Sequence, residues 1–110
     1  DGTCIRDYIH VLDLADAHVK ALNRLLEGDS GDAYNVGTGV GTTVKEVLAA
    51  IGESLGTPVP HAVADRRDGD PPALFARADK IQADLGWVPR WKSIEDIVGT
   101  AVRWAREPKF

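Results

Sequence analysis

Four segments of the chain are predicted to be helical, and three of them carry apolar residues at the three- and four-residue spacing of an amphipathic helix. The first predicted helix begins at Asp13, with Asp16 completing a weak capping box, and stops at Gly28. The second begins after Thr43, which together with Glu46 matches a T-x-x-E capping box. Each of these helices has one apolar side, which predicts that it packs against another element.

Two further helices follow in the second half of the chain. Gly56 and Pro58 end the second helix, and a short third helix is predicted over Asp79–Leu85, before Gly86. Ser93 caps the last helix, which ends before Pro108. The three apolar stripes are Leu14, Ala17, Ala21, Leu22 and Leu25; Val44, Val47, Leu48, Ile51 and Leu55; and Ile94, Ile97, Val98, Ala101, Val102 and Ala105.

Extended segments alternate with the helices. β-branched and aromatic residues predict strands over Ile5–Val11, Ala33–Val36 and Val59–Ala64. Strand, helix, strand, helix and strand, followed by two helices, indicate the α/β class with few short strands. Because three strands leave the apolar stripes with little opposing surface, we expect a partner segment outside this chain. A small free-standing three-stranded domain is the alternative.

Length, charge and cysteine content exclude several classes of protein to which the chain could belong. The 110 residues carry 13 basic and 17 acidic side chains, and the net charge of -4 argues against a nucleic-acid-binding protein. One cysteine excludes an internal disulfide framework, and no apolar run approaches the ~18 residues of a membrane span. A compact domain of this length has a radius of gyration of about 13 Å. Asp1 in place of methionine is expected of a processed chain or an excised fragment.

Three motifs suggest chemistry that their surroundings do not support. Residues 52–56 match the G-x-S-x-G nucleophile elbow, but they lie at the end of a predicted helix rather than between a strand and a helix. Residues 37–42 resemble a dinucleotide-binding loop, yet Thr42 replaces the glycine that close helix packing requires. The three histidines have no metal-ligand spacing, so a structural role is expected for His10 and His18.

Two segments combine cations with residues typical of turns. One contains Arg6 and Tyr8, and the other contains Arg66, Arg67 and Asp70. The planar guanidinium of arginine binds phosphate oxygens in pairs, and a carboxylate accepts hydrogen bonds from sugar hydroxyls. Such a set would suit a ligand that carries both phosphate and sugar. On charge pattern alone, a solvated turn whose charges pair with one another remains the alternative.

Together these residues resemble the UDP-glucose 4-epimerase family of the extended short-chain dehydrogenase/reductases. The similar segments run through the whole chain: Gly2–Val11, Asp13–Ala15, Ala17–His18, Tyr34–Gly37 with Gly39 and Gly41, Val44–Val47, Arg66–Pro71, and Leu85–Trp87 with Pro89. The resemblance departs from the family pattern at Ala76–Lys80, where Arg77 and Asp79 differ in type from the usual residues.

The resemblance implies that residues 1–110 are the C-terminal, UDP-sugar-binding portion of an NAD-dependent epimerase with a Rossmann-type fold. Its catalytic and NAD-binding residues would lie in an N-terminal portion absent from this chain. By position, Arg6 and Arg67 would grip the diphosphate, Tyr8 would line the nucleotide-sugar pocket, and Asp70 would accept from the ribose. No catalytic, cofactor-binding or metal-binding residue is expected here, and the chain alone is predicted to be inactive.

The implied parent reaction interconverts UDP-glucose and UDP-galactose at C4 by transient hydride transfer to NAD, as part of galactose metabolism. The parent is expected to be cytoplasmic and homodimeric, with no nucleic-acid or membrane partner. An excised portion would expose core surface, so self-association is also expected. Two alternatives remain: another nucleotide-sugar enzyme of the same superfamily, such as a dehydratase or decarboxylase, and a non-catalytic nucleotide-sugar-binding fragment.

Overall fold

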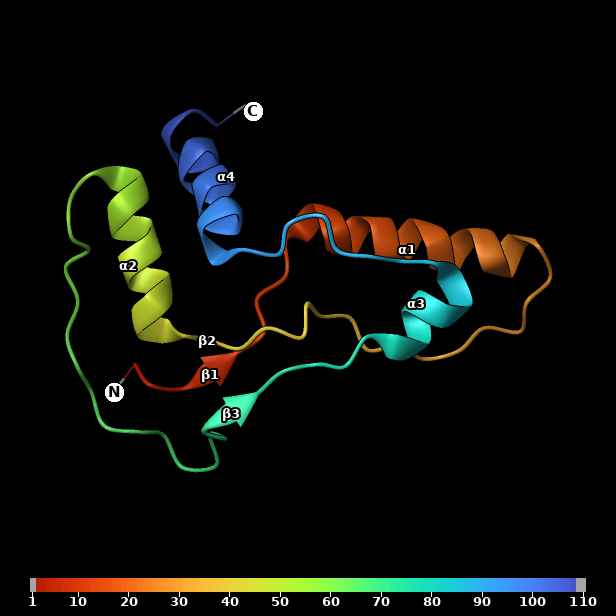
Figure 1. Ribbon diagram of the computed structural model, residues 1–110, viewed down its shortest axis with the longest axis horizontal. Helices are drawn as coiled ribbons and strands as arrows, with labels where there is room; N and C mark the ends of the chain where they lie inside the picture. Colours follow the sequence, from red (N-terminus) through yellow and green to blue (C-terminus); the bar gives the residue numbers. More distant parts are fainter. Residues whose placement is uncertain (1, 109–110) are drawn as a thin grey trace.

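The computed structural model describes residues 2–108 and contains four helices and a small sheet (Figure 1). The helices are α1 (Val11–Leu26), α2 (Val44–Leu55), α3 (Asp79–Leu85) and α4 (Ile94–Arg106). The strands β1 (Ile5–Arg6), β2 (Thr42–Thr43) and β3 (Ala73–Leu74) form a sheet in the order β2-β1-β3. This arrangement confirms the predicted α/β class with few short strands.

The central strand β1 brings distant parts of the chain together. Ile5 lies opposite Thr43 of the antiparallel strand β2, and opposite Ala73 of the parallel strand β3. Figure 1 shows α2 and α4 side by side on one side of the molecule and α1 with α3 on the other. The chain between α2 and β3, residues 57–72, runs along the edge of the molecule without helix or strand, and we call it the strap.

The molecule is less compact than a domain of its length. Its radius of gyration is 16.6 Å and its extents are 50 × 37 × 21 Å, so the expectation of about 13 Å is wrong. The buried hydrophobic residues are Ala17, Ala50, Ala78, Ile81, Trp87 and Val98. Trp87 is the largest of them and is completely buried, where its indole N–H donates to the Asp13 carbonyl over 2.8 Å.

Most helix ends follow the predicted chemistry. Thr43 and Glu46 form the reciprocal capping box of α2, and the Ser93 hydroxyl accepts from the Asp96 N–H at the start of α4. Gly56 and Gly86 follow α2 and α3 with φ of +80° and +67°, which is the left-handed cap conformation that glycine favours. These predictions are confirmed because each depends on residues within a few positions of the helix end.

The predicted start of the first helix is wrong. His10, not Asp13, caps α1: its Nδ1 accepts the Leu12 N–H over 3.0 Å. The Thr100 hydroxyl donates to the Ile97 carbonyl, so His10 Nε2 donates to Thr100 over 2.7 Å. His10 is the N-cap of α1 and does not lie within a strand, contrary to the prediction. Its ring stacks on the Trp91 ring, with the ring centroids 4.3 Å apart.

The strand predictions were too long or misplaced. Only residues 5–6 of the predicted strand Ile5–Val11 pair in the sheet, and Ala33–Val36 and Val59–Ala64 form no strand. The second and third strands are instead the two-residue segments β2 and β3. A strand needs a neighbouring strand to satisfy its backbone groups, and local composition cannot supply one.

Helix α1 shows apolar side chains on two sides. Ala17 is buried towards α3 and Trp87, as the stripe predicted, whereas Leu22 and Leu25 of that stripe remain about half exposed. From Leu22, at the edge of that stripe, exposed apolar side chains continue onto an adjacent side of α1 with Leu12, Val19 and Leu26. No helix among residues 2–108 is long and apolar enough to cross a membrane.

Candidate functional site

The four residues selected from the sequence line one cavity of about 620 Å³. The cavity lies between the start of the chain, α2 and the strap. Arg6 and Tyr8 come from β1 and the residues after it, whereas Arg67 and Asp70 come from the strap. The other lining residues are Gly2, Cys4, Val44, Lys45, Leu48, His61, Ala62, Val63, Ala64, Asp65 and Arg66. The fold therefore brings together residues that are more than 60 positions apart in the sequence.

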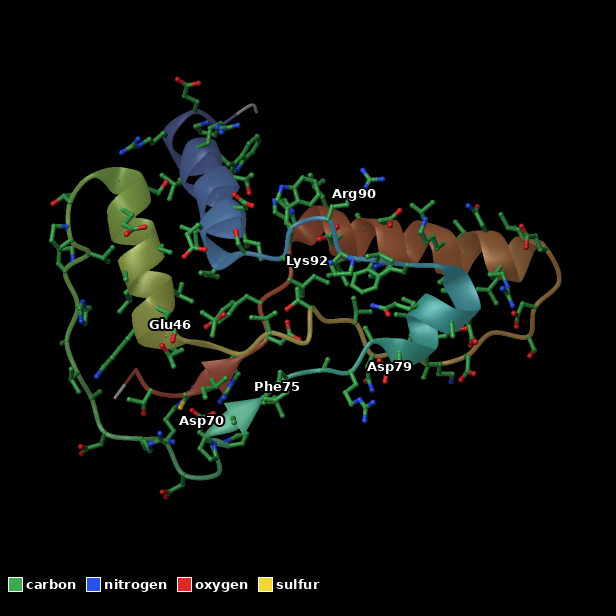
Figure 2. All side chains as sticks on the ribbon, viewed as in Figure 1. Glu46, Asp70, Phe75, Asp79, Arg90 and Lys92 are labelled. Atoms are coloured by element: carbon green, nitrogen blue, oxygen red, sulfur yellow. The ribbon has the colours of Figure 1, made fainter. Side chains whose placement is uncertain are left out.

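The two arginines meet at one carboxylate. Arg6 Nη2 donates to Asp70 Oδ1 over 2.8 Å, and Arg67 Nη2 donates to Asp70 Oδ2 over 3.3 Å. Figure 2 shows Asp70 at the end of the strap, just before β3. A single guanidinium nitrogen of each arginine makes these contacts, so other N–H groups of Arg67, whose side chain is 85% exposed, face solvent. The cluster holds two cations close together with donors to spare.

The surroundings of Asp70 favour its charged form. Partial burial would raise the pKa of the Asp70 carboxyl, but hydrogen bonds and charges from Arg67 and Arg6 outweigh that effect. The pKa of Asp70 is therefore lowered from its usual value. An ionised Asp70 keeps both arginines near the cavity, and carboxylate oxygens can also accept from hydroxyl groups.

Arg66, the neighbour of Arg67, also lines the cavity. Its Nη2 donates to the Thr3 hydroxyl over 2.9 Å, so it anchors the strap to the start of the chain. Tyr8 is half-buried in the lining. The two predicted pairs, Arg6 with Tyr8 and Arg67 with Asp70, therefore line the same cavity.

The cavity is basic although the chain is acidic. Its lining carries four basic side chains, from Arg6, Lys45, Arg66 and Arg67, against two acidic ones, from Asp65 and Asp70. Such a local excess of positive charge attracts anionic ligands in a chain whose net charge is -4. Among residues 2–108, no group of histidine, cysteine and carboxylate side chains could hold a metal ion.

Strand β1 is held in position by the residue next to Arg6. The Asp7 carboxylate accepts the Thr38 N–H over 3.0 Å, the Thr38 hydroxyl over 2.7 Å and the Gly39 N–H over 2.8 Å. It also accepts the Ala76 N–H over 3.4 Å. Asp7 thereby ties three segments together directly beside the cavity arginine.

These contacts explain the glycine-rich loop that resembles a dinucleotide-binding loop. Its amide groups hold the protein's own anion, Asp7, rather than being free for a phosphate. A Cβ at Gly37 would lie 2.6 Å from Asp7 Oδ2, and one at Gly41 would lie 2.5 Å from Ile5 Cγ2. Gly37 and Gly41 therefore allow the loop to pack closely on Asp7 and β1, which accounts for two of its three glycines without a bound dinucleotide.

Helix α2 also contributes to the cavity, which its sequence pattern did not predict. Val44 and Leu48 were assigned to an apolar stripe, yet they line the cavity together with Lys45. The sequence signal for Lys45 is its place as a cation in the first turn of a helix, where acidic residues are favoured. A second cavity of about 560 Å³ adjoins the first, sharing Lys45, Leu48 and His61, and its lining is mostly apolar.

Comparison with known proteins shows which enzymes this chain is similar to. The model of the NAD dependent epimerase/dehydratase family matches residues 1–37. The UDP-glucose 4-epimerase of Azospirillum brasilense is 53% identical over 106 residues, which are 96% of this chain and 30% of that protein.

Solved structures agree with the sequence comparison. A crystal structure of UDP-glucose 4-epimerase superposes with a TM-score of 0.89 at 44% identity, over 99% of this chain and 33% of that one. The UDP-glucose 4-epimerase from Bifidobacterium longum, in complex with NAD+ and UDP, gives a TM-score of 0.84 at 38% identity, over 98% of this chain and 32% of that one.

The family model thus matches about the first third of this chain, and over those residues the chain is similar to the NAD dependent epimerase/dehydratase family. The relatives described above are UDP-glucose 4-epimerases, so the resemblance seen in the sequence is confirmed. The chain spans about a third of the length of the relatives it matches.

Proposed function

We propose that this chain is the UDP-sugar-binding portion of an NAD-dependent UDP-glucose 4-epimerase. The observation that carries the proposal is the cavity in which Arg6, Tyr8, Arg67 and Asp70 lie together. It combines cationic donors for a diphosphate with a carboxylate for sugar hydroxyls. Relatives that share 38% to 53% of their residues with this chain bear that enzyme's name.

The parent reaction inverts C4 of UDP-glucose or UDP-galactose, and NAD supplies a transient hydride acceptor. This chain's part is to hold the nucleotide. Arg6 and Arg67 grip the diphosphate, Asp70 accepts from the ribose, and Tyr8 borders the pocket. Anchoring the diphosphate fixes one end of the substrate in place, while the sugar end keeps the freedom it needs to turn between the two hydride transfers.

The catalytic and NAD-binding groups are assigned to a portion outside these 110 residues. Two observations support this division. The glycine-rich loop at residues 37–42 uses its amides on Asp7, so it does not fit NAD. The exposed row Leu12, Val19, Leu22 and Leu26 makes α1 apolar on a second side, as expected of a helix buried inside a larger protein.

Assigning nucleotide binding to this chain and catalysis to another portion of the parent leads to further expectations. The parent is a cytoplasmic homodimer of galactose metabolism, and the isolated chain has no epimerase activity. Exposed apolar side chains on α1 favour self-association of the isolated chain. Turnover of UDP-galactose by the isolated chain would contradict the assignment of catalysis to the missing portion.

The binding proposal is tested by titrating UDP into the chain by calorimetry. We expect the double variant Arg6→Ala plus Arg67→Ala to bind at least about tenfold more weakly, because it loses two charge-assisted donors. The matched control is Arg90→Ala plus Arg103→Ala, which removes the same charge from residues outside the cavity lining. Figure 2 shows Arg90 beside the N-terminal part of α1, away from Asp70. Unchanged affinity in the first variant would refute the proposed anchor.

A further inference from the structure

Lys45 is the second residue of α2 and borders both cavities described above. Its backbone N–H donates to the Gly2 carbonyl over 3.0 Å, which fixes the first turn of α2 against the start of the chain. A Cβ at Gly2 would lie 2.9 Å from Lys45 Cγ, so the lysine stem occupies the space that a side chain at position 2 would need. The base of the side chain is thus held beside the cavity that contains the arginines.

The position of Lys45 is electrostatically unfavourable for the helix. The N-terminal turn carries the positive end of the helix dipole, so a cation there costs free energy, whereas an acidic residue would be stabilising. Among residues 2–108, the Lys45 ammonium has no hydrogen bond or ion pair that would offset this cost. A residue that violates a local preference without internal compensation points to a ligand outside the helix.

Lys80 provides the comparison, because it occupies the same second position in α3. Its Nζ lies 2.6 Å from Asp32 Oδ2 and 3.3 Å from the Ala33 carbonyl, and it sits 5.2 Å from the centre of the Tyr34 ring. The hydrogen bond with Asp32 raises the pKa of Lys80 above its usual value. The unfavourable position of Lys80 is therefore compensated within the protein, whereas that of Lys45 is not.

We propose that Lys45 is a third cation of the nucleotide site and binds the same phosphate-bearing anion as Arg6 and Arg67. The inference rests on the proposed function, since it adds a residue to that site. Arg6 and Arg67 are already bridged by Asp70, so part of their charge is neutralised before a ligand arrives. Lys45 supplies positive charge that no carboxylate of the described residues neutralises.

The primary test is UDP titration of Lys45→Gln against the wild-type chain. We expect about three- to tenfold weaker binding and a shallower dependence of affinity on salt concentration, because one cation fewer contacts the ligand. Lys20→Gln is the matched control: it removes the same charge from α1, where Lys20 pairs with Asp16 at 3.5 Å on the surface. Equal affinities for wild type and Lys45→Gln would overturn the inference while leaving the proposed function intact.

A stability measurement separates binding from a structural role. Replacing a cation in the first turn relieves its clash with the helix dipole, so Lys45→Gln should melt at the same or a slightly higher temperature than wild type. Lys45→Glu should melt higher still and bind UDP more weakly than Lys45→Gln. A lower melting temperature in both variants would assign Lys45 to the fold and contradict the proposal.

A second measurement works even if the isolated chain binds no UDP. Cys4 is the only cysteine and lines the same cavity, so its rate of reaction reports on the local charge. We expect Lys45→Gln to slow the reaction with the dianionic disulfide 5,5′-dithiobis(2-nitrobenzoate) at least about twofold relative to neutral iodoacetamide. Lys20→Gln should leave that ratio unchanged. Absence of UDP binding would count against the proposed function, and an unchanged ratio for Lys45→Gln would count against the role of Lys45.

Discussion

Asp13 and Asp70 use the same functional group for opposite purposes. Asp13 is 1% exposed, and its carboxylate accepts the backbone N–H groups of Arg90 and Trp91 at 3.0–3.1 Å. The Asp70 side chain is 24% exposed, and its partners are the side chains of Arg6 and Arg67. Backbone amides cannot leave a buried carboxylate, whereas guanidinium groups can exchange one anion for another. The comparison separates a carboxylate that maintains the fold from one that organises a site.

The largest effect on stability is expected from replacing Asp13, the buried carboxylate of the two. Asp13→Ala removes a buried carboxylate and leaves the partly buried N–H groups of Arg90 and Trp91 without their acceptor, which should lower the free energy of unfolding by about 3 kcal/mol. Urea denaturation monitored by circular dichroism measures the change. Asp16→Ala on the surface of the same helix should change it by less than about 0.5 kcal/mol. A loss below about 1 kcal/mol for Asp13→Ala would show that the buried carboxylate is dispensable.

A smaller effect is expected at the loop that surrounds Asp7. Gly37→Ala would place a Cβ 2.6 Å from Asp7 Oδ2 and 2.8 Å from the Ala76 Cβ. We expect a loss of about 1–3 kcal/mol in the free energy of unfolding, since neither neighbour can retreat without breaking the contacts of Asp7.

Gly99→Ala is the matched control, because a Cβ at Gly99 meets nothing within 4 Å. That residue lies inside α4, where alanine is the better helix former, so a gain of about 0.5–1 kcal/mol is expected. Thermal unfolding of the two variants side by side gives the answer. Equal changes of the same sign would show that the loop is not tightly packed on β1.

The smallest effect on stability is expected at Asp70. Because its pKa is lowered in the folded chain, its contribution to stability is present above the usual aspartate value of 3.8 and is lost as the pH falls through the folded value. A carbon-13 NMR titration of the Asp70 carboxyl should give a midpoint below 3.8, and Arg67→Gln should move it upward. A midpoint at or above 3.8 in the unmodified chain would mean that the arginines do not hold Asp70 in solution.

The parts of the fold that depend on neighbouring residues could be predicted from the sequence. The capping box of Thr43 with Glu46 and the glycine at position 56 act within four residues, and both are confirmed. The start of α1 was missed because the His10 ring, whose other nitrogen bonds to Thr100 in α4, caps the helix instead of Asp13. The strands were missed because pairing depends on which distant segments meet.

The candidate site divides in the same way. Spacing could indicate Arg6 with Tyr8 and Arg67 with Asp70 as pairs, but only the fold brings the pairs into one cavity. The alternative prediction, a turn whose charges pair with one another, is also partly correct, because Arg67 forms an ion pair with Asp70. The contact between Asp70 and Arg6 across 64 positions makes the difference, and no local pattern indicates it.

The position of Asp7 has a practical consequence for variant screens. Asp7 follows Arg6 directly, but its carboxylate bonds to the glycine-rich loop and does not line the cavity. Replacing Asp7 would displace β1 and move Arg6 away from Asp70 of the strap. A screen scored only by retention on a nucleotide resin would therefore rank Asp7 with the ligand contacts. Scoring each variant for folding as well as for retention would identify Asp7 as a residue that maintains the fold.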